Sequence, residues 1–137
     1  MQLLVRNVLK KKGNVVRVGI IVVVGASLVS LAAHAQGDAA QGKIVAMQCQ
    51  ACHSFKAGEN RIGPSLHGLF GRKAGTAPNF AYSPAMRRSG ITWDEQALKS
   101  YLPDPQKKVP GTKMLFAGIS DPKKVDDVIA YLKEATK

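Results

Sequence analysis

Both cysteines of this 137-residue chain lie in one short stretch, CQACH at positions 49–53, which ends in a histidine. Two thiols at this spacing beside a histidine are typical of three kinds of site: a zinc site, a redox dithiol, or the attachment point of a haem. Each kind requires different residues and elements elsewhere in the chain. The remaining sequence therefore decides between them.

A zinc site and a redox dithiol find little support in that remaining sequence. After residue 35 the only further histidine is His67, and three zinc ligands within five consecutive residues cannot easily surround a tetrahedral ion. A thioredoxin-like dithiol needs a neighbouring strand and a first cysteine at a helix N-terminus. Here the stretch follows a predicted helix, and no segment alternates like a strand. Both interpretations are disfavoured.

Covalent haem attachment is the one interpretation that uses Cys49, Cys52 and His53 together. Each thiol can add to one vinyl group of the porphyrin, and the adjacent histidine can bind the iron. A buried macrocycle would also supply core to a small chain with only 6% aromatic residues. The sequence thus predicts one covalently bound haem c per chain.

Residues 1–35 predict a secretory signal peptide. A basic segment without acidic residues precedes an apolar run at 18–33, and AHA at 33–35 is a small-x-small cleavage site. The alternative is an uncleaved anchor, but the apolar run is shorter than the roughly 20 residues that a spanning helix needs. We expect a single domain at 36–137 in the bacterial periplasm, or on the periplasmic face of the inner membrane if the anchor is retained.

The charge of the mature chain is moderate. Residues 1–35 hold five of the 20 basic residues and none of the nine acidic ones, so cleavage lowers the formal charge from +11 to +6. Such an excess suits acidic protein surfaces or an anionic membrane face. Nucleic acid is disfavoured because no basic tract is interleaved with aromatic residues. We expect a monomer whose partners are acidic proteins.

The mature chain predicts an all-α fold of three to five short helices joined by Gly- and Pro-rich loops. Capping residues indicate helices at 39–50 and 84–88. A capping box of Thr92 and Glu95 starts a helix that carries Trp93 to Leu102 and stops at Pro103, and Asp121-Pro122 starts a C-terminal helix. The stretch at 104–118 is expected to lack regular structure.

Two of these helices have a predicted apolar face. In the first helix it is formed by Ile44, Val45 and Met47. In the C-terminal helix the apolar residues recur at i, i+3, i+4 and i+7: Val125, Val128, Ile129 and Leu132.

The second axial ligand separates an electron carrier from a haem enzyme or gas sensor, whose iron keeps an open face. His/Met ligation gives a carrier with a raised potential. Met114, in the irregular stretch VPGTKMLF, is the preferred ligand, whereas Met47 and Met86 are assigned to packing. His67, alone in a glycine-rich loop, is a rival ligand. No residue resembles a catalytic acid, base or nucleophile, so we expect a one-electron carrier rather than an enzyme.

Six segments in order along the mature chain resemble class I cytochrome c, of the cytochrome c2 and c550 type. The resemblance runs from Gly37 to Thr136 and rests on GKIVAMQCQACHS, GPSLHGLFGRKAG, FAYSPAM, ITWDE, YLPDPQKKVPGTKM and VIAYLK. It implies the small all-α cytochrome c fold around one haem. It also implies electron transfer between respiratory or photosynthetic redox proteins.

The resemblance implies a role for each matching position. Cys49 and Cys52 would carry the thioethers, His53 and Met114 would be the axial ligands, and the Pro64 carbonyl would orient His53. The remaining implied residues surround the haem propionates or the Met114 sulfur: Arg72, Tyr82 and Trp93 for the propionates, and Tyr101 and Thr112 for the sulfur.

Three features depart from the family pattern. Val45 and Ala46 stand where the first helix commonly carries an aromatic residue that packs on the Tyr131 side, so a weaker helix contact is expected there. Met86 replaces a residue that is often asparagine in a buried water network. Gln48 replaces a lysine common near the exposed haem edge.

The resemblance also implies a basic ring that docks acidic redox partners, such as a quinol-cytochrome c reductase, a terminal oxidase, a reaction centre or a dehydrogenase. Arg87 and Arg88 add charge without an assigned role, and Gly42 is expected where the first helix crosses the last. The ring would consist of Lys43, Lys56, Arg61, Lys107, Lys108 and Lys113.

Overall fold

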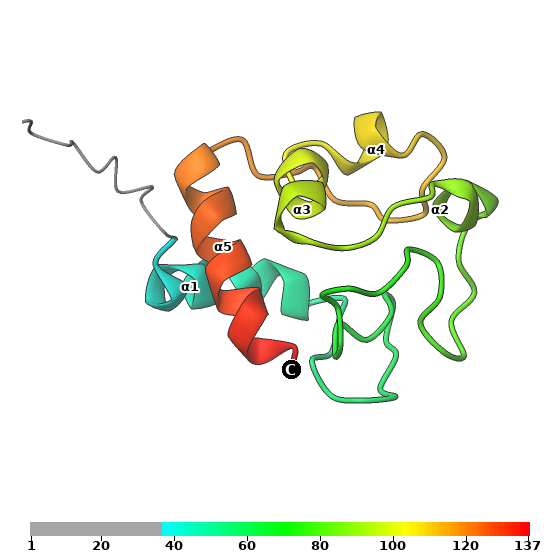
Figure 1. Cartoon of the computed structure of the whole chain (residues 1–137), viewed down its shortest axis with the longest axis horizontal. Helices are drawn as coiled ribbons and strands as arrows, with labels where there is room; N and C mark the ends of the chain where they lie inside the picture. The colour runs from blue at the N-terminus through cyan, green and yellow to red at the C-terminus, as the bar shows by residue number, and fades with distance from the viewer. Residues whose placement is uncertain (1–36) are drawn as a thin grey trace, which may run out of the picture. The chain divides into compact units, whose positions relative to one another are not determined.

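The computed structural model describes residues 37–137, and the predictions for residues 1–35 lie outside this range. Within this range, five helices are joined by long loops (Figure 1): α1 Ala39–Gln50, α2 Pro84–Arg88, α3 Glu95–Tyr101, α4 Pro105–Lys108 and α5 Pro122–Ala135. The described range contains no strand, only an isolated bridge between Lys73 and Thr92. The predicted all-α fold is confirmed.

The predicted starts of α1, α2 and α5 are confirmed. Asp38, Ser83 and Asp121 each accept hydrogen bonds from backbone N–H groups in the first turn of the helix that follows, and α2 and α5 have proline near the start.

The predicted capping box at Thr92 is wrong. Thr92 pairs with Lys73, and the Trp93 N–H donates to the Arg72 carbonyl at 2.9 Å, which holds this backbone outside the helix. Asp94 is the N-cap instead, with its carboxylate accepting from the Ala97 N–H at 2.7 Å.

Helix α4 lies where no regular structure was expected. Asp104 caps it by accepting from the Lys107 N–H at 2.9 Å, and Pro105 follows at the first helical position. The Asp-Pro pair is the signal that also starts α5. One turn is too short to show a periodic apolar pattern, which is why periodicity did not indicate it.

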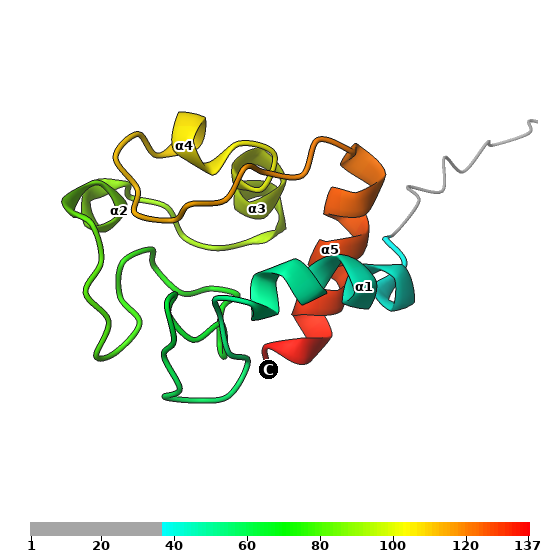
Figure 2. The same cartoon turned by 180° about the vertical axis from the view of Figure 1, so that it is seen from behind.

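Helices α1 and α5 pack closely across each other (Figures 1 and 2). The four predicted apolar residues of α5 are buried. Of the three residues predicted for the apolar side of α1, Val45 is half-buried against the core, whereas the prediction is wrong for Ile44, which is 63% exposed, and for Met47, which is 66% exposed. Helix α1 buries Gly42 and Ala46 instead. A Cβ on Gly42 would lie 1.9 Å from the Asp127 carbonyl oxygen, so only glycine allows the observed approach. Gly42 therefore lies directly against α5, and the expectation for this residue is confirmed.

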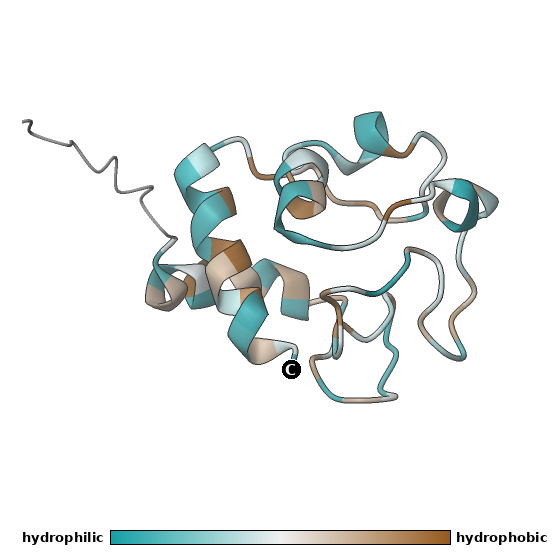
Figure 3. Ribbon diagram, in the orientation of Figure 1, coloured by the Kyte–Doolittle hydropathy of each residue, from teal (hydrophilic) through white to brown (hydrophobic). Residues whose placement is uncertain are grey.

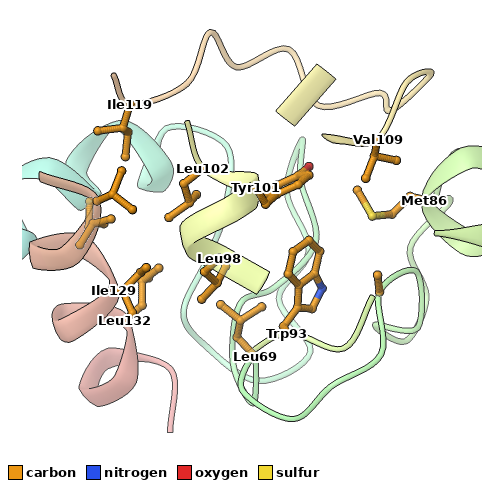
Figure 4. Close-up of a cluster of buried hydrophobic side chains, with 14 residues drawn as sticks. Leu69, Met86, Trp93, Leu98, Tyr101, Leu102, Val109, Ile119, Ile129 and Leu132 are labelled. Atoms are coloured by element: carbon orange, nitrogen blue, oxygen red, sulfur yellow. The ribbon is translucent and has the colours of Figure 1, made fainter. Parts of the chain in front are cut away.

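The core continues from α5 through α3 to the loops (Figure 4). Leu98, Tyr101 and Leu102 of the α3 segment are each 4–6% exposed. Trp93 packs edge-on against Tyr101, with ring centroids 4.9 Å apart. Figure 3 shows brown, apolar segments of α3 and α5 where they border this core.

Asp127 joins the start of α1 to α5. Its buried carboxylate accepts the Asp38 N–H at 2.6 Å and pairs with Lys123. The hydrogen bond from Lys123 and that from the Asp38 backbone lower the pKa of Asp127. A carboxyl with a lowered pKa stabilises the fold above its unfolded pKa of about 3.9. This contribution is lost as the pH falls below that value.

Asp127→Asn is therefore expected to lower the melting temperature at pH 7 and to have a smaller effect near pH 3. Thermal unfolding of the haem-loaded protein at both pH values measures this difference. Glu134→Gln removes a carboxylate from the exposed side of α5 and should leave the melting temperature nearly unchanged. An equal loss for Asp127→Asn at both pH values would contradict the role of the charge.

Within residues 37–137, no helix has the length and apolarity required to cross a membrane.

Candidate functional site

The CQACH stretch closes the last turn of α1. The N–H groups of Cys52 and His53 donate to the Cys49 carbonyl at 3.1 and 2.9 Å. The turn places both half-buried thiols in the wall of one cavity. Burial is the main cause that raises the pKa of the Cys49 thiol.

His53 is fixed in a single orientation. Its Nδ1–H donates to the Pro64 carbonyl at 2.7 Å, which leaves Nε2 without a proton and free to bind a metal. Burial lowers the pKa of His53 and so favours this neutral form. Gly63 lies against the ring, where a Cβ would come within 2.4 Å of Cε1. A side chain at position 63 would displace the imidazole.

The cavity has a volume of about 310 Å³ and is mostly apolar. Its walls come from the end of α1, the loops at 62–83 and 112–116, α2, the α3 segment and α5. Leucine and aromatic side chains provide most of the lining: Leu66, Leu69, Phe80, Leu98, Leu102, Phe116 and Leu132. Such a chamber, with two thiols, a neutral imidazole nitrogen and a thioether in its wall, has the donors and the apolar lining that a covalently attached haem requires.

Met114 is held by three polar contacts. Tyr101 donates its hydroxyl hydrogen to the Met114 sulfur at 3.3 Å, and the Met114 N–H donates to Thr112 Oγ1 at 3.3 Å. Gln106 of α4 donates to the Met114 carbonyl at 2.9 Å. Nothing in the sequence indicated Gln106, because its contact depends on the unexpected helix α4.

Arg72 lies in the cavity wall, and two of its guanidinium nitrogens donate hydrogen bonds to the backbone. They donate to the carbonyls of His67 and Ser65, at 2.8 and 2.9 Å. A guanidinium has five N–H donors, so further donors remain for an anionic group in the cavity. Tyr82, whose pKa is raised by burial, packs edge-on against Phe80 nearby.

All of the predicted site residues line this single cavity. Residues that the sequence did not single out complete it, among them Phe80 and Ile62. Asn60 was also missed: it donates to the carbonyls of Pro78 and Asn79 and accepts from the Ser65 N–H, joining two loops of the wall. These contacts join segments far apart in the sequence, and no local pattern indicates them.

The rival ligands differ in position. His67 is exposed and does not line the cavity. Met86 is 7% exposed and lines it, in agreement with its predicted packing role. The predicted packing of Met47 is wrong, because α1 buries its glycine and alanine face and turns this side chain to solvent.

Comparisons with known protein families and with individual proteins all point to one family. Residues 39–136 match the family described as Cytochrome c. The chain is 53% identical to cytochrome c2 of Blastochloris viridis, over 77% of this chain and 84% of the relative. It is 47% identical to cytochrome c-550 of Bradyrhizobium diazoefficiens, over 72% and 74%.

A solved structure gives the same result. Cytochrome cH from Methylobacterium extorquens superimposes with a TM-score of 0.66 and 57% sequence identity, covering 71% of this chain and 98% of that chain. Cys49, Cys52 and His53 provide the C-x-x-C-H motif for covalently bound haem c. The chain belongs to the cytochrome c family and is a small c-type cytochrome that carries electrons and is not an enzyme.

Proposed function

We propose that His53 Nε2 and Met114 Sδ are the two axial ligands of the haem iron. The observation that carries this proposal is the shared cavity, which has a neutral imidazole and a tethered thioether in its wall. When bound, the haem supplies a one-electron ferrous/ferric couple. The protein keeps both ligands in place and excludes water, so electron transfer requires little rearrangement.

The other wall residues orient the ligands and neutralise charge. The Pro64 carbonyl fixes the ring of His53, a type of contact that tunes the basicity of a ligand. Arg72, Tyr82 and Trp93 would provide hydrogen bonds to the propionate carboxylates, which are costly to bury without partners. Arg72 is suited to this role because its carbonyl contacts preorganise the guanidinium.

Tyr101→Phe is expected to lower the reduction potential by about 20–60 mV. The Tyr101 hydroxyl withdraws electron density from the Met114 sulfur, which disfavours the ferric state. The magnitude corresponds to one hydrogen bond of about 0.5–1.5 kcal/mol that acts on one oxidation state. Redox titration measures it. The matched control is Tyr131→Phe, because that ring packs on Phe55 outside the cavity. A potential that changes equally in both variants would contradict the role of Tyr101.

We infer that acidic redox partners dock beside the cavity, with Lys113 in contact. Lys113 lines the cavity and is exposed, and it lies between Thr112 and Met114. Ile62 and Leu115, 82% and 97% exposed, add apolar contact area there. Arg61, also assigned to the ring, is paired with Glu59 at 2.8 Å and so contributes less free charge.

Lys113→Gln is expected to lower the rate constant for electron transfer with an acidic redox protein severalfold at low ionic strength. The difference should disappear near 1 M salt, where charges are screened beyond about 3 Å. Stopped-flow kinetics measures it. Lys124→Gln, the same change on α5, is the control and should have little effect. Equal losses for the two variants would point to net charge rather than to docking at this position.

We propose that residues 1–35 direct export and are removed, and that the mature domain at 36–137 works in the bacterial periplasm. The support is the sequence pattern of a basic segment, an apolar run and a small-x-small site. Mass spectrometry of the purified protein tests this proposal. A mature N-terminus at Gln36 is expected, and a retained N-terminus would favour the anchored alternative.

A further inference from the structure

The loop at 110–118, which carries Met114, has few backbone contacts with the rest of the domain. In the part of the chain that the structure describes, residues 113–118 make no backbone–backbone hydrogen bond. The nearest ones flank them: the Thr112 N–H donates to the Val109 carbonyl at 3.0 Å, and the Ile119 N–H donates to the Leu102 carbonyl at 2.9 Å. A segment with so few contacts opens at a low cost in free energy.

Gln106 of α4 connects this loop to the rest of the domain. Its side-chain nitrogen donates to the Met114 carbonyl at 2.9 Å and to the Thr112 carbonyl at 3.4 Å. An amide nitrogen carries two hydrogens, so one side chain can serve both acceptors. Within residues 37–137 no other group donates to either carbonyl. In Figures 1 and 2 the segment that follows α4 turns near α2 and runs back past α4.

Helix α4 is itself held firmly, although it has only one turn. Asp104 caps it, and the side chain of Pro105 is fully buried. At the far end of the loop, a Cβ on Gly118 would lie 2.0 Å from the Pro103 carbonyl oxygen. The loop therefore returns to the chain just before α4. These contacts give Gln106 a fixed position from which to hold the loop.

Two different helices hold the two ends of Met114. Its sulfur accepts the hydroxyl hydrogen of Tyr101, in α3, at 3.3 Å, and its carbonyl accepts the amide of Gln106, in α4. A bond to the sulfur alone leaves the backbone free to move away, because a methionine side chain has three rotatable bonds. The bond to the carbonyl fixes the backbone. It therefore also fixes the direction from which the thioether enters the cavity.

The alternative is that Gln106 is an ordinary exposed side chain of α4. Glutamine favours helix, and water can replace an exposed hydrogen bond at a small cost. That role, however, does not require the amide to reach the two carbonyls on either side of Lys113. It also predicts that replacing Gln106 has no effect on access to the cavity.

We propose that Gln106 is a positioning residue that keeps the loop at 110–118 closed over the cavity. This inference rests on the axial ligation by Met114 proposed above. When the loop opens, the bond from the sulfur to the iron breaks and a neutral ligand such as imidazole binds the iron instead, with no proton or electron transferred. Loss of both hydrogen bonds from Gln106 should raise the population of the open loop about two- to tenfold.

Imidazole binding to the ferric, haem-loaded protein measures this opening. Gln106→Glu keeps the size of the side chain but has no donor when ionised, and Gln106→Leu has no polar group. Both variants should raise the affinity for imidazole about two- to tenfold. The matched controls are Gln96→Glu and Gln96→Leu, because Gln96 is exposed at the second position of α3 as Gln106 is at the second position of α4. The controls should bind imidazole like the wild type.

A further control separates this role from a general loss of stability. Asp127→Asn is expected to lower the melting temperature through the contact between α1 and α5, which is remote in sequence from the loop. It should leave the affinity for imidazole unchanged. A rise in Asp127→Asn equal to that in the Gln106 variants would overturn the specific role of Gln106.

Hydrogen exchange of the Met114 amide gives a readout that does not depend on the iron ligand. This N–H donates to Thr112 Oγ1 at 3.3 Å and is protected while the loop is closed. Both Gln106 variants should exchange it about two- to tenfold faster than the wild type, whereas the Gln96 controls should not.

Met114→Ala distinguishes a failure of this inference from a failure of the axial ligation. If Met114→Ala binds imidazole more tightly than the wild type, the axial ligand stands, and Gln106 variants that behave like their Gln96 controls overturn the inference. A rise in Gln106→Glu alone would also overturn it, because the new charge rather than the lost donor would be the cause. If Met114→Ala binds imidazole no more tightly than the wild type, Met114 is not the ligand. Faster exchange of the Met114 amide in both Gln106 variants then still supports their contact with the loop, and unchanged exchange overturns it.

Discussion

Replacing Met114 by alanine is expected to lower the reduction potential by about 0.2 V or more, since axial ligands set haem potentials over a range of about 0.8 V. With Met114 as the proposed axial ligand, its thioether would favour the ferrous iron, and its removal would leave one face of the haem open. Tyr101 also loses the sulfur to which its hydroxyl donates. The variant should bind carbon monoxide rapidly and gain peroxidase activity. Redox titration and carbon monoxide mixing measure both effects.

Met86→Ala is the matched control, because Met86 also lines the cavity and, like Met114, carries a thioether side chain. Its replacement should destabilise the core but leave carbon monoxide excluded and shift the potential much less. If Met86→Ala gave the large fall and Met114→Ala hardly any, Met86 would be the axial ligand.

Gly42→Ala is expected to destabilise the domain by about 3 kcal/mol or more. In an open helix position this change would stabilise by about 1 kcal/mol, because alanine favours helix. Here the new Cβ would lie 1.9 Å from the Asp127 oxygen and 2.9 Å from the Tyr131 Cβ. The first of these atoms belongs to the backbone of α5 and cannot turn away, so the helices must separate.

Thermal and denaturant unfolding measure this loss, which corresponds to a fall in melting temperature of about 12 °C or more for a domain of this size. Gln41→Ala changes the neighbouring, exposed position and should stay within about 0.5 kcal/mol of the wild type. A Gly42→Ala protein as stable as the Gln41→Ala control would mean that α1 and α5 are not in close contact. Because α1 ends in CQACH, its displacement should also disturb the haem spectrum.

Local chemistry explains what the sequence predicted well. Asp38, Ser83 and Asp121 act on backbone N–H groups within three residues, so their effect can be read without knowledge of the fold. The buried face of α5 follows from a strong helical period. Thr92 failed as a cap because a distant partner, Lys73, pairs with it.

Packing between distant segments explains what could not be predicted. Ile44 and Met47 are the larger apolar residues of α1, yet close approach at Gly42 brings its small face against α5. In the site, the C-x-x-C-H motif and the family resemblance indicated part of the cavity wall, including both cysteines, His53 and Met114, but not Phe80 or Ile62. The hydrogen bond from Gln106 to the Met114 carbonyl depends on α4, a helix too short for a periodic apolar pattern to indicate.

The most direct test of the central claim is the optical response of the wild-type protein to carbon monoxide and to oxidation. With His53 and Met114 both on the iron, the ferrous protein should not bind carbon monoxide at neutral pH. The ferric protein should show the weak long-wavelength band of a methionine sulfur on haem iron. Rapid carbon monoxide binding, without that band, would contradict the account of a closed electron carrier.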